Sequence, residues 1–163
     1  MKIRHFLTYG QNHILEAIEN LSATDWETPG VCDEWSAKDV VAHLAALENV
    51  LLDVLKSMLG DDDTPQLQAF TADPDFNENE VLKRRNKSWI VVLAELALAH
   101  DEVMNLIDRI PEQVFRQKGV LARYGVDYDV EDFVVHMYYG HKREHAAQIE
   151  IFQSLKTRIR EVI

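Results

Sequence analysis

The stretch SAKDVVAHLAALENVLLDVLKSMLG, residues 36–60, decides the fold class of this chain. Its apolar residues recur every three or four positions, which is the spacing of one buried helix face. Ser36 followed three residues later by Asp39 is the signature of a helix start, and Gly60 is a typical helix stop. The stretch therefore predicts one long helix that is well defined at both ends.

A long connection follows this helix. Residues 60–77 contain two prolines and five aspartates and show no helical periodicity. A helix of ~23 residues is ~35 Å long, whereas a link of this length reaches ~59 Å when extended. Because a hairpin needs only a few residues, we predict a crossover that lets the helices before and after it run parallel.

The rest of the chain repeats the helical pattern, without the short alternating rhythm of β-strands. The predicted helices cover residues 3–21, 36–60, 78–110 and 129–160, and the connections between them include a loop at 22–35. The fourth helix begins at Asp129, with Asp132 completing a second capping signature. The chain has 163 residues, the size of one domain. We therefore predict an all-α four-helix bundle in a single domain, residues 1–163.

Composition excludes several classes of partner. The net charge is −11, from 28 acidic and 17 basic residues, and such a balance repels phosphate backbones and anionic lipids. No apolar run approaches the ~20 residues that a membrane span requires. The N-terminus does not resemble a signal peptide, and the single cysteine, Cys32, fits a reducing compartment. We expect a cytoplasmic protein with a small-molecule substrate and without nucleic-acid or membrane partners.

Two histidines of the fourth helix carry the first chemical signal. His141 and His145 are four residues apart, so their rings lie one above the other, ~6 Å apart, and can converge on one metal ion. At 100° per residue both fall at the centre of the apolar stripe that contains Val134 and Met137. The alternative is a pair of ordinary buried histidines, because imidazole is intermediate in its preference for burial.

His43 is the third candidate ligand. It lies two turns into the helix at 36–60, on the shoulder of the apolar stripe. If this helix and the fourth are antiparallel neighbours, His43 lies close to His141 and His145. The alternative is an ordinary histidine on the helix surface.

Two motifs resemble the DinB/YfiT-like superfamily: EWSAKDVVAHL at residues 34–44 and HKREHAAQI at residues 141–149. The resemblance implies an up-down-down-up four-helix bundle that frequently forms homodimers. It also implies a divalent metal, usually zinc or nickel, held by three histidines that correspond to His43, His141 and His145. Some branches of the superfamily lack the complete triad, whereas all three positions are filled here.

Three protein ligands leave a coordination position open for water or substrate, which is typical of a catalytic rather than a structural site. We therefore predict a metal-dependent enzyme, a thiol S-transferase or hydrolase acting on a small electrophile. Superfamily members include thiol-dependent S-transferases and the mycothiol-dependent maleylpyruvate isomerase, so a low-molecular-weight thiol as partner and a role in detoxification or stress response follow by analogy. The alternative is a non-catalytic metal- or ligand-binding bundle.

Other side chains have weaker signals, and no catalytic residue is assigned. Cys32 is either a nucleophile beside the site or an idle thiol, and Tyr138 is either a hydrogen-bond donor to the site or a core residue. His100 is expected to be a hydrogen-bonded core residue. Helical projection places His136 about 140° away from His141, and places Glu48 off the inner face of its helix.

Overall fold

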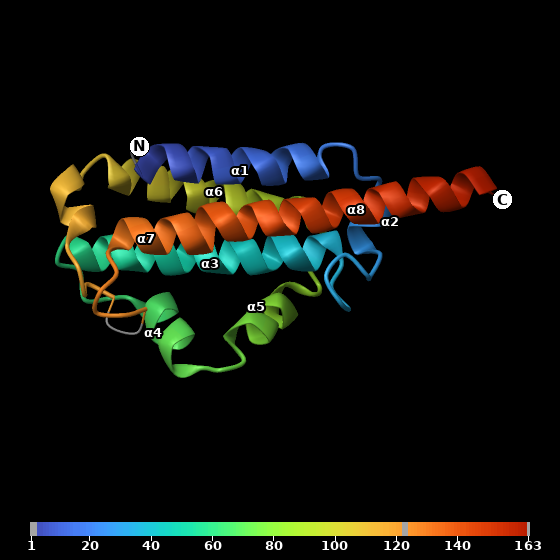
Figure 1. Ribbon diagram of the computed structural model, residues 1–163. Helices are drawn as coiled ribbons and strands as arrows, with labels where there is room; N and C mark the ends of the chain where they lie inside the picture. Colours follow the sequence, from blue (N-terminus) through green and yellow to red (C-terminus); the bar gives the residue numbers. More distant parts are fainter. Residues whose placement is uncertain (1–2, 122–123, 163) are drawn as a thin grey trace.

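The computed structural model describes residues 3–121 and 124–162, and within these ranges the protein is all-α, as predicted (Figure 1). The α-helices are α1 (Ile3–Ile18), α2 (Ala23–Glu27), α3 (Ala37–Met58), α4 (Pro65–Ala72), α5 (Phe76–Arg84), α6 (Trp89–Ile107), α7 (Val130–Val134) and α8 (His141–Val162). A 3₁₀ turn, η1, covers Glu112–Arg116, and a π-helical turn, η2 (Val135–Gly140), joins α7 to α8. The predicted loop at 22–35 thus contains a short helix, which Ser22 caps.

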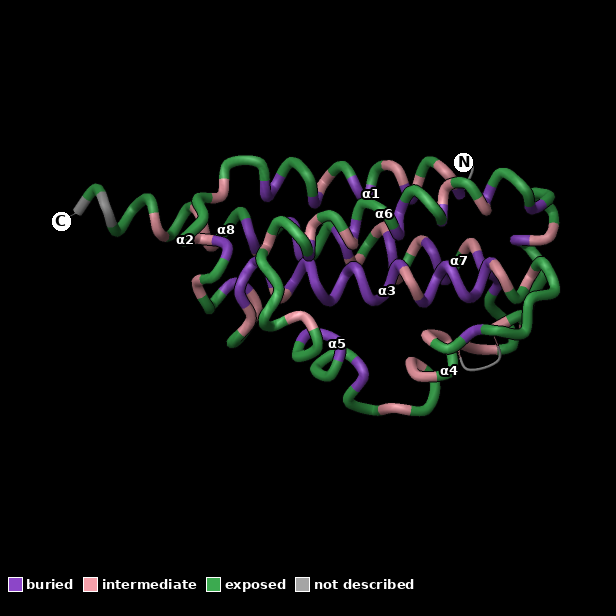
Figure 2. Tube along the Cα trace, turned by 180° about the vertical axis from the view of Figure 1, so that it is seen from behind, coloured by how far each residue is buried: buried purple, intermediate pink, exposed green. Residues whose placement is uncertain are grey.

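The central element is α3, the helix predicted from residues 36–60. Its capping signature is confirmed: Ser36 Oγ accepts a hydrogen bond from the Asp39 amide at 3.2 Å, and the Ser36 amide donates to Asp39 Oδ2 at 3.0 Å. Gly60 follows its end with φ +88°, a conformation that glycine adopts without strain. Nearly the whole length of α3 is buried, because α2, α4, α5, α6 and α8 all pack on it (Figure 2).

The connection after α3 is not structureless, so this part of the prediction is wrong. It contains α4 and the start of α5, which together form a layer outside the long helices (Figure 1). The buried Asp53 on α3 anchors α4, since its Oδ2 accepts hydrogen bonds from the amides of Gln66 and Leu67 at 2.6 and 3.0 Å. The layer carries the chain back, so that α6 runs from the end where α3 starts toward the end where α7 lies.

The predicted helix at 78–110 is two helices. The chain breaks after Arg84, and Ser88 starts α6 by accepting a hydrogen bond from the Val91 amide at 3.3 Å. The periodicity looked continuous because α5 and α6 each have one apolar face, but these faces are not in line. Leu82 of α5 is therefore exposed, whereas Leu96 of α6 is fully buried.

The fourth predicted helix starts at Asp129 and is capped by the Asp129–Asp132 pair, as predicted. The π-helical turn that follows was not predicted. Its wider backbone spacing rotates the residues after it relative to a regular α-helix. Helix α1 lies directly against this turn: a Cβ at Gly10 would lie only 2.6 Å from the Tyr138 carbonyl oxygen, so the close approach requires glycine.

Length and apolar composition decide whether a helix can cross a membrane. Within residues 3–121 and 124–162, no helix combines the length and the apolar composition needed to cross a bilayer.

Candidate metal centre

The structure brings His43, His141 and His145 together, as the sequence predicted. Their ligating nitrogens all lie within 4.8 Å of one another, and this is the only such group of histidine, cysteine or carboxylate side chains in the described residues. His43 comes from α3, and the other two come from the first two turns of α8. The three rings pack edge to face or tilted, with centroids 4.5 to 5.4 Å apart.

The Nε2 atoms point toward one another. His141 Nε2 lies 3.4 Å from His43 Nε2 and 2.9 Å from His145 Nε2. Two nitrogens bound to one tetrahedral zinc ion at its usual bond length lie ~3.3 Å apart. The arrangement therefore fits a shared divalent ion, and these three residues could hold one.

All three imidazoles are held in the neutral form that metal ligation requires. Burial, with smaller effects from His141 and His145, lowers the pKa of His43 to about 3. Burial and the neighbouring His145 lower the pKa of His141 to about 4, and burial also lowers the pKa of His145. At neutral pH the site therefore presents nitrogen lone pairs rather than positive charges.

Gln148, the last polar residue of the second sequence motif, sets the orientation of His145. His145 Nδ1 donates a hydrogen bond to Gln148 Oε1 at 2.8 Å, because an amide oxygen can only accept. In the neutral ring this leaves the lone pair on Nε2, facing the other two histidines. The Gln148 amide also hydrogen-bonds Cys32, so Cys32 lies in the shell behind the ligands.

The thiol of Cys32 is not activated. Burial raises its pKa, the nearby Asp33 raises it further, and the Gln148 hydrogen bond acts only weakly in the opposite direction. A thiol with a raised pKa is a poor nucleophile at neutral pH. The nucleophile hypothesis for Cys32 is therefore not supported, and its position instead suits packing behind Gln148.

One side of the histidine cluster faces a cavity of about 350 Å³. His43 and His141 line this cavity together with Phe70, Met137 and Glu144. His145 does not line it and is buried behind the other two rings. An ion held by the three histidines would thus be reached from this side.

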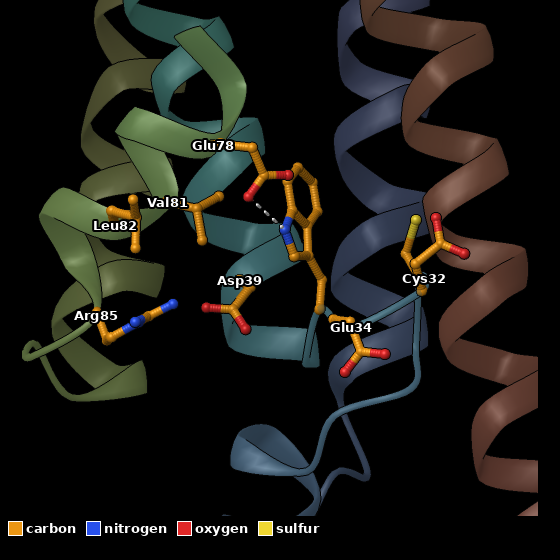
Figure 3. Close-up of a pocket in the computed structure, with 9 residues that line it drawn as sticks. Cys32, Glu34, Asp39, Glu78, Val81, Leu82 and Arg85 are labelled. Carbon is orange, nitrogen blue, oxygen red and sulfur yellow. Dashed lines mark hydrogen bonds between the residues drawn. The ribbon is translucent and has the colours of Figure 1, made fainter. Parts of the chain in front are cut away.

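On another side, Trp35 covers the cluster. Its ring centroid lies 5.2 Å from that of His43, and its Nε1 donates to Glu78 Oε2 at 3.4 Å. A second cavity of about 440 Å³ begins at this indole, where Arg85 and Asp39 point toward one another (Figure 3). Trp35 therefore forms a wall between the histidine cluster and this second cavity.

A second buried polar cluster lies deeper in the bundle, with side chains from α1, α3, α6 and α8, and it was not predicted from the sequence. Lys142 is 1% exposed and Glu48 is fully buried, so the prediction that Glu48 lies off the inner face is wrong. Lys142 Nζ donates to Glu48 Oε1 and, at 2.8 Å, to Gln11 Oε1. His100 Nδ1 donates to the same Glu48 oxygen at 3.5 Å, which confirms His100 as a hydrogen-bonded core residue.

The π-helical turn explains why positions on the fourth helix were misjudged, whereas Glu48 is buried because other helices pack on nearly all sides of α3. The buried stripe of the fourth helix runs through Tyr138, Lys142 and Ile149, whereas His141 lies at its edge rather than at its centre. Tyr138 is a core residue whose hydroxyl donates to the Leu47 carbonyl at 2.7 Å. His136, predicted to face away from His141, lines the same cavity as His141.

These features define a class: an all-helical protein in which three neutral histidines converge beside a cavity, a candidate metal centre. The chain belongs to the DinB superfamily, whose family model matches residues 7–149. The match spans α1 through the two histidines of α8 and confirms the resemblance seen in the two motifs. A comparison with curated proteins and a comparison with solved structures each found no match.

Proposed function

We propose that this protein is a metal-dependent enzyme that acts on a small electrophile as a thiol S-transferase or hydrolase. His43, His141 and His145 would hold a divalent transition metal, zinc or nickel. The observation that carries the proposal is the convergence of three neutral Nε2 atoms beside a cavity. When bound, such an ion acts as a Lewis acid and lowers the pKa of a water or thiol ligand.

The residues of the chain would supply positioning and proton transfer. Gln148 holds the His145 ring with its Nε2 lone pair facing inward. Besides the ligands, Glu144 and His136 are the described cavity-lining side chains whose residue types serve as general acids and bases. Glu144 is close enough to His141 to raise its pKa slightly against the effect of burial. These two side chains are the ones we assign to proton transfer.

The first test is metal content. Protein prepared without a histidine tag and incubated with Zn²⁺ or Ni²⁺ should retain about one ion per chain by elemental analysis, because the site has three ligands and one open position. The variant His145→Ala should lose the ion. The control variant His13→Ala should keep it, because His13 is a half-buried residue of α1 that is not one of the three ligands. Wild-type protein that retains no ion would overturn the ligand assignment and the proposed mechanism.

The second test is chemistry. Metal-loaded protein is assayed with a panel of low-molecular-weight thiols and a model electrophile, and separately with activated esters and amides. The proposal expects metal-dependent turnover in one of these assays, with a role in detoxification or stress response as its context. Bound metal without turnover in either assay would instead favour a non-catalytic metal- or ligand-binding protein.

We also propose that the protein is a cytoplasmic homodimer built on an up-down-down-up bundle. The end of α8 extends beyond the other helices (Figure 1) and exposes Ile151, Leu155 and Ile159, which share one face of the helix. Such an apolar stripe supports contact with a second copy. Light scattering that gives a monomer mass at micromolar concentration would remove the dimer from the proposal.

A further inference from the structure

A third cavity, of about 380 Å³, is an apolar groove beside the candidate metal centre. It is bounded by Leu67 and Phe70 of α4, Val120 and Tyr124 of the connection before α7, and Phe133 and Met137 of α7 and η2. None of the described residues that line it carries a charge. Its volume is within the usual range for small-molecule sites, which are mostly apolar.

The groove continues into the cavity that faces the histidines. Phe70 and Met137 line both spaces, so the two meet along these side chains. Both views of the fold place α4 and α7 at the same end of the molecule (Figures 1 and 2). A molecule in the groove could therefore extend to His43 and His141 without leaving the protein surface.

The walls of the groove are held in place by aromatic contacts. Phe70 packs edge to face on Phe76 at 5.4 Å between centroids, and Tyr124 packs in the same way on Phe133 at 5.1 Å. Such contacts give the groove a shape before any ligand binds. A preformed apolar groove favours a ligand with an aliphatic or aromatic part.

The negative charge of the protein further restricts the charge that a ligand of the groove can carry. Glu144 stands at the histidine end of the combined space, and the chain carries a net charge of −11. An anionic ligand would meet this negative field on approach. A neutral molecule meets no such barrier and loses little hydration when its apolar part enters the groove.

We propose that the groove binds the apolar part of the substrate, so that the substrate is an uncharged amphiphile. Its polar end reaches the candidate metal centre, and its aliphatic or aromatic part lies between α4 and α7. This inference rests on the proposed function for the identity of the polar end, but the groove itself can be tested without metal.

The metal-free test uses N-phenyl-1-naphthylamine, a neutral aromatic probe that becomes fluorescent in apolar sites. Metal-free protein should bind it saturably. Val120→Asp should weaken binding at least tenfold, because it places a carboxylate in the groove wall. Val126→Asp is the matched control: Val126 lies in the same connection, is 72% exposed and does not line the groove, so binding should be unchanged.

The second test uses zinc-loaded protein and alkyl hydroxamic acids of increasing chain length, which are uncharged in solution and lose a proton when they bind zinc. Affinity, measured by calorimetry, should rise about fourfold for each methylene group that enters the groove. In Val120→Asp this dependence on chain length should flatten, while the affinity of acetohydroxamic acid should stay the same.

The outcomes separate this inference from the proposed function. Binding of acetohydroxamic acid without any gain from a longer chain, or probe binding that Val120→Asp leaves unchanged, would overturn the groove and leave the metal centre standing. Probe binding to a protein that takes up no zinc would overturn the proposed function and support the groove. Probe binding that falls as protein concentration rises, with a dimer mass, would show that a second copy occupies the groove and would overturn the inference.

Discussion

The two buried polar clusters of this protein lie side by side between α3 and α8, yet they are built in opposite ways. In the Glu48–Lys142 cluster the charges oppose each other: burial alone raises the pKa of Glu48, but Lys142 and His100 outweigh it and hold that pKa below its usual value. In the histidine cluster three groups of the same kind face each other, and His43 and His141 each lose basicity through burial and their neighbours.

The difference indicates which cluster needs a ligand. Lys142 has both a carboxylate and an amide oxygen as partners inside the protein. The positive charge of its ammonium group is therefore balanced within the protein. The Nε2 lone pairs of the three histidines face one another, and Glu144 lies near enough to His141 to favour a positive charge there, so a cation would satisfy all three at once. A buried cluster whose opposite charges balance supports the fold, whereas a buried cluster of converging lone pairs points to binding of a cation.

The largest expected effect comes from breaking the complete cluster. Lys142→Met leaves the Glu48 carboxylate buried without its counter-charge, which should cost about 3–5 kcal/mol in the free energy of unfolding. Urea denaturation measures this loss. The double variant Lys142→Met, Glu48→Leu should recover most of it, because no buried charge remains. A loss below about 1 kcal/mol in the single variant would mean that the pair contributes little.

The next effect is the pH dependence of the metal-free protein. Unfolded histidines take up protons below their ordinary pKa of 6.5, whereas folded His43 does so only near pH 3. The unfolded state therefore binds more protons in this window, and stability falls as pH falls, by about 3 kcal/mol from pH 6.5 to 4. Denaturation at a series of pH values should show this fall, and His43→Asn should reduce it. An unchanged slope in the variant would assign the fall to other groups.

A similar but slightly smaller effect is expected when metal is added. Zinc at one hundred times its dissociation constant should stabilise the folded protein by about 2.7 kcal/mol, since it binds the folded state. Thermal unfolding with and without Zn²⁺ measures the shift. His43→Ala should abolish it, whereas His100→Asn, in the other cluster, should keep it. If both variants lost the response, the two clusters would not be separable.

The smallest effect concerns the shell behind the ligands. Gln148→Leu removes the partner of His145 Nδ1 and should weaken zinc affinity ten- to a hundredfold, while the free energy of unfolding changes by less than about 1 kcal/mol. Gln153→Leu is a control on the same helix, because Gln153 bonds the Ala17 carbonyl, away from the site. Titration against a competing chelator gives the affinities. Equal affinities in both variants would contradict the positioning role.

The sequence predicted the meeting of the three histidines for a sound physical reason. A connection long enough to cross the molecule returned α6 to the starting end of α3, which made His43 a possible neighbour of α8, and the resemblance of the two motifs to the superfamily then assigned all three histidines to one site. The helix caps at Ser36 and Asp129 could also be predicted from the sequence, because each capping motif lies within four consecutive residues.

The parts of the structure that the sequence did not predict depend on backbone features that a helical projection ignores. A projection at a constant 100° per residue has no place for a π-helical turn, so Lys142 was not placed on the buried face of the fourth helix. Glu48 was misplaced for another reason: other helices pack on nearly all sides of α3, so its buried surface is not a single face. The break before Ser88 was missed because two short apolar faces in sequence look like one long face. The errors at Lys142 and before Ser88 arise where the backbone departs from a regular helix.

The layer formed by α4 and α5 has a consequence for how this protein can diversify. All three histidines come from α3 and α8, whereas the α4 wall of the apolar groove comes from a segment that contributes no histidine ligand. Insertions or exchanges within residues 61–75 can therefore reshape what the groove accepts while the histidines keep their spacing. A chimera that carries this segment from another member of the superfamily would inherit a new ligand preference on an unchanged centre.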